Sequence, residues 1–142
     1  MAAACAVAAA GCGGPSHSAG SREWHANAKL ALRQLTQDVA STAVGGDTVA
    51  DARRALHDES RLYALVMAYT DLGGCNSMMR NVGAPPSLEA RLSRPCAPLT
   101  RAAASFTAAT AGSNASALLR AGRDAERALP LLVEALAEVR KA

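Results

Sequence analysis

Apolar residues recur at steps of three and four along four separate segments of this 142-residue chain. In the segment 22–44 the repeating positions are Trp24, Ala28, Leu32, Leu35 and Val39. Side chains at this spacing share one face of an α-helix. The chain also holds 35 Ala and 16 Leu but no Ile and only four aromatic residues. Because Ala and Leu favour helices and sheets favour β-branched and aromatic residues, the sequence predicts an all-α fold.

The helix boundaries follow from glycine, proline and capping residues. The second helix is expected from an N-cap at Asp47 to about residue 72, where Gly73-Gly74 ends it. The third is expected to begin near Pro95 or Pro98, since proline suits the first turn of a helix.

The fourth helix is expected to start after a cap at Ser113 or Asn114 and to run to the C-terminus. Pro130 removes one backbone hydrogen bond, so a kink is predicted there. Short linkers at 45–46 and 112–113 make neighbouring helices antiparallel. The sequence thus predicts an up-down four-helix bundle over residues 22–142, with one long crossover.

That crossover covers residues 75–95, which we expect to form a short helical turn near 75–82 and then a loop. Cys75 and Cys96 flank it. A disulfide between them would staple the crossover; two buried free thiols are the alternative. The spacing gives no Cys-x-x-Cys, so a zinc or redox role is not indicated.

The N-terminal 20 residues contain no Asp, Glu, Lys or Arg. An Ala/Val run ends in Ala9-Ala10-Gly11-Cys12, which resembles the lipobox of bacterial lipoproteins. The resemblance implies a diacylglyceryl group on Cys12 and removal of residues 1–11 as a signal peptide. Residues 12–21 would then be a lipidated, flexible tether holding the domain on the extracytoplasmic face of the cell membrane.

Two alternatives to this anchored form remain: an exported chain without lipid, and a cytosolic protein. No Lys or Arg precedes the Ala/Val run, although signal peptides carry such residues. Either translation starts upstream of Met1, or residues 1–11 are only an Ala-rich tail.

Charged residues indicate a solvated surface rather than a catalytic or nucleic-acid site. The net charge is +3, without a block of like charges. His57 has cations rather than ligands at helical spacing, and we expect Asp58 to pair with Arg54 and Arg61. No metal ligand, cofactor site or catalytic residue is predicted, so an enzyme is not expected.

Residues 62–69 are apolar on all sides of the predicted helix, so something must cover them. Either the 75–95 connection folds over this face, or it is an exposed patch for a protein partner or a small apolar ligand. The candidate patch residues are Leu62, Tyr63, Val66, Met67 and Tyr69. Trp24 is similarly ambiguous between a core residue and a membrane-facing anchor.

The expected function is that of a membrane-anchored lipoprotein of the cell envelope with a non-enzymatic binding or structural role. The first alternative is a soluble exported module with a binding groove around residues 63–69. The second is a cytosolic helical-bundle interaction protein.

Overall fold

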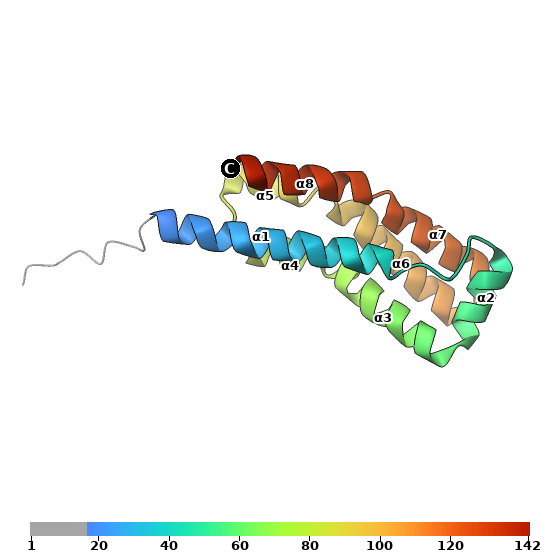
Figure 1. Ribbon diagram of the computed structural model, residues 1–142. Coiled ribbons are helices and arrows are strands. Elements are labelled where there is room, and N and C mark those ends of the chain that lie inside the picture. The colour runs from blue at the N-terminus through green and yellow to red at the C-terminus, as the bar shows by residue number, and fades with distance from the viewer. Residues whose placement is uncertain (1–16) are drawn as a thin grey trace, which may run out of the picture.

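The computed structural model describes residues 17–142, with side chains from Arg22 onward, as a bundle of helices (Figure 1). In chain order they are α1 (His17–Ala40), α2 (Val49–His57), α3 (Glu59–Gly73), α4 (Cys75–Asn81), α5 (Pro86–Leu92), α6 (Cys96–Ala111), α7 (Ala115–Glu126) and α8 (Leu129–Lys141). Residues 17–142 contain no strand, which confirms the all-α class. The predicted lipidation site Cys12 and the segment 1–11 lie outside the described residues.

Helix α1 carries the predicted apolar seam into the core. Ala28, Leu32 and Leu35 are fully buried, and Trp24 is only 7% exposed. The helix lies beside α8 and α3 along the length of the bundle (Figure 1). Trp24 is therefore a core residue, and its alternative interpretation as a membrane-facing anchor is wrong. Helix α1 also begins at His17, within the segment that the sequence predicts as tether.

The predicted second helix is divided at Asp58, so a continuous helix to residue 72 is wrong. Asp58 has extended backbone angles (φ −94°, ψ 108°), and its side chain accepts a hydrogen bond from the Arg61 N–H. It therefore caps α3, and Arg54, which the sequence pairs with Asp58, forms its ion pair with Asp51 instead. The N-cap of α2 is Thr48 rather than Asp47.

The connection 75–95 is more helical than the sequence suggests. Its first part forms α4, as predicted, but α5 replaces part of the expected loop. Pro86 lies in the first turn of α5, where a missing N–H costs nothing and a fixed φ suits the helix. Helix α5 packs against α8, with Leu92 buried and Arg91 3.4 Å from Glu138.

The predicted disulfide between Cys75 and Cys96 is present. Both cysteines are buried, and they are the first residues of α4 and α6. Their Cα atoms lie 5.3 Å apart although 21 positions separate them in the sequence. The bond therefore ties the two ends of the crossover together in the core.

The C-terminal half contains the predicted cap and a break where a kink was expected. Asn114 caps α7, and its Oδ1 accepts a hydrogen bond from the Ala117 N–H at 3.0 Å. The chain then divides into α7 and α8 at residues 127–128, with Pro130 in the first turn of α8. Pro130 is exposed, so its ring meets solvent rather than the core.

Candidate functional site

The predicted patch on α3 is partly exposed. Tyr63 is 68% exposed, Met67 52% and Val66 42%, while Leu62 is half-buried. The crossover does not cover these side chains: α4 packs on α1, α3 and α6, and α5 packs on α8. We call Tyr63, Val66 and Met67 the α3 patch.

Tyr69 does not belong to the α3 patch, so that part of the prediction is wrong. Its side chain is only 2% exposed and its ring stacks on Phe106, with 4.3 Å between ring centroids. The difference is geometric, because Tyr69 follows Tyr63 by six residues and therefore lies about 120° around the axis of α3 from it. A continuous apolar run thus contains both a core face and an exposed face.

A cavity of about 380 Å³ lies between the segment that follows α1 and the second half of α7. Its walls combine apolar, glycine and charged residues: Thr42, Ala43, Val44, Gly45, Gly46, Asp47, Leu118, Leu119, Gly122, Arg123 and Glu126. This volume falls in the range of small-molecule sites, which is roughly 300–1,000 Å³. No site is predicted here from the sequence, because residues 42–47 and 118–126 meet only in the folded chain.

The glycine pair makes the turn on one side of the cavity. Gly45 has φ +90°, a backbone conformation that favours glycine, and a β-carbon there would lie 2.9 Å from Arg61 Nη1. A β-carbon on Gly46 would overlap the Asp51 carboxylate. Gly45 therefore requires glycine for its backbone conformation, whereas a side chain at position 46 would displace the Asp51 carboxylate.

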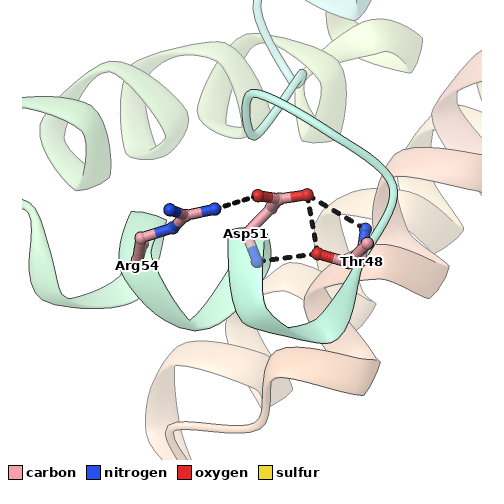
Figure 2. A network of polar contacts seen from close by, with 3 residues as sticks. All are labelled: Thr48, Asp51 and Arg54. Carbon is pink, nitrogen blue, oxygen red and sulfur yellow. Dashed lines mark hydrogen bonds and ion pairs between the residues drawn. The ribbon is translucent and has the colours of Figure 1, made fainter.

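The start of α2 holds this turn in place through a capping box (Figure 2). The Thr48 Oγ1 accepts a hydrogen bond from the Asp51 N–H at 3.1 Å, and the Thr48 N–H donates to Asp51 Oδ2 at 3.3 Å. Figure 2 also shows the Arg54 guanidinium against Asp51 Oδ1. These hydrogen bonds lower the pKa of Asp51, Thr48 being the main cause, and keep the carboxylate charged.

Behind the floor of the cavity lies the hydroxyl of Tyr69. A β-carbon on Gly122 would be 4.0 Å from Tyr69 Oη, and both Gly122 and Thr42 line the cavity. The Oη is buried and has no hydrogen-bond partner among the described residues; the neighbouring Thr42 hydroxyl donates its proton to the Val39 carbonyl at 2.7 Å. Burial is the main cause that raises the pKa of Tyr69, and the hydroxyl therefore stays protonated at neutral pH.

Two oppositely charged side chains of α7 line the cavity without forming an ion pair with each other. Arg123 and Glu126 are three positions apart on α7, the spacing of many helical ion pairs, and both line the cavity. Within residues 22–142 neither takes part in an ion pair, whereas the neighbouring Arg127 pairs with Asp124 at 3.2 Å. The two side chains therefore offer one positive and one negative group to a single cavity.

His57 and His25 do not line this cavity. His57 is exposed at the end of α2, and His25 stacks on Trp24 with 4.0 Å between ring centroids. Among the described residues, no group of three or more His, Cys, Asp or Glu side chains is placed to hold a metal ion.

No helix in the described part of the chain combines the length and hydrophobicity that a membrane span requires. Comparison of the chain with protein-family models, with curated proteins and with solved structures gives no match.

Proposed function

We propose that the protein is a lipid-anchored protein of the bacterial cell envelope whose helical domain binds a ligand or a partner without catalysing a reaction. The observation that carries the proposal is the Cys75–Cys96 disulfide. Disulfides persist in oxidising compartments and are rare in the reducing cytosol, so this bond supports export. Export is also what the Ala9-Ala10-Gly11-Cys12 pattern implies, and Cys12 would carry the anchor.

We further propose that the domain is an up-down four-helix bundle whose second and fourth members are each broken once. The members would be α1, α2 with α3, α6, and α7 with α8, and the stapled crossover would contain α4 and α5. Packing of α3 on α6, α6 on α7 and α1 on α8 supports this grouping. Such a bundle would place the N-terminal end of α1, and hence the anchor, at the opposite end from α2 (Figure 1).

A binding role agrees with the chemistry of the cavity. A general acid or base must reach its substrate, and its pKa must be tuned by the site. The groups with a strongly raised pKa are Asp38 and Tyr69, and neither lines the cavity. The charged groups that do line it, Asp47, Arg123 and Glu126, are suited to hold a ligand by charge and hydrogen bonding.

Metabolic labelling with a fatty-acid analogue tests the anchor directly. The wild-type protein and Cys5→Ser should both be labelled and found in the membrane fraction, whereas Cys12→Ser should be unlabelled. Cys5 is the matched control because it lies in the segment that the lipobox resemblance removes. Labelling of Cys12→Ser at the wild-type level would overturn the proposed anchor.

A second candidate role is docking of a protein partner on the α3 patch. The observation in its favour is the exposure of Tyr63 and Met67, both more than half exposed. Exposed aromatic and Met side chains are enriched in protein interfaces. A partner that co-purifies from the envelope should be lost with Tyr63→Ser and retained with Leu30→Ser, a change of a similarly exposed residue on α1. Loss with both variants would show that the effect is not specific to the α3 patch.

A further inference from the structure

The cavity between α7 and residues 42–47 has features that select for one class of ligand. Arg123 offers a guanidinium and Glu126 a carboxylate; both residues are exposed, and neither forms an ion pair within residues 22–142. A ligand with a single charge would satisfy only one of them. A molecule that carries both an ammonium and a carboxylate group would satisfy both.

The remaining lining fits the same ligand. The N–H groups of Gly45 and Gly46 donate to no backbone carbonyl within residues 17–142, so they are additional donors for a carboxylate. Asp47 is a second acceptor for an ammonium group. The side chains of Val44, Leu118 and Leu119 supply an apolar wall. The volume of about 380 Å³ suits a small molecule rather than a polypeptide segment.

Gly122 supports a role for the cavity beyond packing. It lies in the interior of α7, where glycine costs roughly 1 kcal/mol relative to alanine. A β-carbon there would meet no atom closer than Tyr69 Oη at 4.0 Å, so helix packing does not exclude a larger residue. Gly122 therefore leaves space beside α7 that a larger side chain would fill.

We propose that this cavity binds a free amino acid with an apolar side chain. Its carboxylate would pair with Arg123, its ammonium group with Glu126, and its side chain would pack on Leu118 and Leu119. This inference deepens the proposed binding function by naming its ligand class. It does not depend on the lipid anchor, because every residue involved belongs to the helical domain.

Isothermal titration calorimetry of the full-length protein, with its disulfide intact, tests the proposal with L-leucine as the probe. Isoamylamine lacks the carboxylate of L-leucine, and isocaproate lacks its ammonium group. Each should bind at least about tenfold more weakly than L-leucine, since each loses one charge-assisted contact. Binding of either analogue as tightly as L-leucine would overturn the zwitterion requirement.

Variants then assign the binding to this cavity. Arg123→Gln and Glu126→Gln should each weaken L-leucine binding about tenfold or more, and Gly122→Leu should abolish it by filling the floor. Arg120→Gln is the matched control, because Arg120 is exposed on α7 and does not line the cavity. Circular dichroism confirms that each variant stays folded.

The proposal is wrong if L-leucine, L-valine and L-phenylalanine all fail to bind the folded wild-type protein, or if Arg123→Gln binds L-leucine as the wild type does. The failure of the lipid anchor is a separate outcome. A protein that binds L-leucine but takes up no fatty-acid label would lose the anchor and keep the ligand site. A protein that takes up the fatty-acid label but binds no amino acid would keep the anchor and lose the ligand site.

Discussion

Asp38 on α1 and Asp71 on α3 bring two carboxyl groups together in the interface between these helices. Asp38 is only 7% exposed, and its Oδ1 accepts a hydrogen bond from Gln34 Nε2 at 3.2 Å. Its Oδ2 has no hydrogen-bond partner among the described residues. Burial first, and the Asp71 charge second, raise the pKa of Asp38 to about 6 from the usual 3.8.

The first prediction is a pH dependence of stability that runs against the usual acid denaturation. Because the folded state holds the Asp38 proton more tightly than the unfolded state, its stabilising effect is fully present below the unfolded pKa of 3.8 and is lost as pH rises through about 6. The loss should amount to at most about 3 kcal/mol in the free energy of unfolding. Urea unfolding at a series of pH values measures it.

Asp38→Asn should remove that pH-dependent loss and stabilise the domain at pH 7, since an amide can still accept from Gln34. Asp47→Asn, at an exposed position outside the interface between α1 and α3, is the matched control. An Asp38→Asn profile identical to that of the wild type would contradict the assignment.

The second prediction concerns the disulfide. Reduction should lower the free energy of unfolding by about 3 kcal/mol, because the bond closes a loop of 21 residues that is otherwise free in the unfolded chain. Cys75→Ala and the double variant Cys75→Ala/Cys96→Ala should lose similar amounts, as either thiol alone forms no bond. Helix content by far-ultraviolet circular dichroism should change little. Unchanged stability after complete reduction would show that the crossover needs no staple.

The third prediction is that Thr48→Ala destabilises the domain by about 1 kcal/mol. The change removes the hydroxyl that accepts the Asp51 N–H hydrogen bond and leaves the first turn of α2 uncapped. Thr100→Ala, at an exposed position within α6, should be neutral or slightly stabilising. Thermal unfolding distinguishes the two. A Thr48→Ala protein as stable as the wild type would mean that the capping box contributes nothing measurable.

The fourth prediction is that Tyr69→Phe stabilises the domain by about 1 kcal/mol. The substitution removes a buried hydroxyl without a partner and preserves the ring that stacks on Phe106. Tyr63→Phe should change stability little, because Tyr63 is 68% exposed. Chemical denaturation of both variants checks the difference, and a loss of stability in Tyr69→Phe would reveal a hydrogen bond that the hydroxyl makes in solution.

Local sequence determined several of the helix boundaries. Gly112 and Asn114 end one helix and cap the next, because their own backbone and side chain satisfy the helix ends. The spacing of apolar residues by three and four determined which face of α1 is buried, because side chains at this spacing share one face of a helix with 3.6 residues per turn. The pairing of Cys75 with Cys96 also followed from the sequence, as both border one connection.

Only the tertiary structure decided features that depend on residues far apart in the chain. The sequence around Asp58 is compatible with either a continuous helix or a helix cap. The packing of α2 on α7 and of α3 on α6 decides for the break between α2 and α3. The apolar pattern of residues 62–69 does not distinguish the exposed Tyr63 from the buried Tyr69, because exposure depends on which side of α3 packs against α6. The cavity joins residues 42–47 to α7, about 75 positions later, and no periodicity within either segment records that contact. Helix identity is encoded by neighbours along the chain, whereas a binding surface is made by neighbours in space.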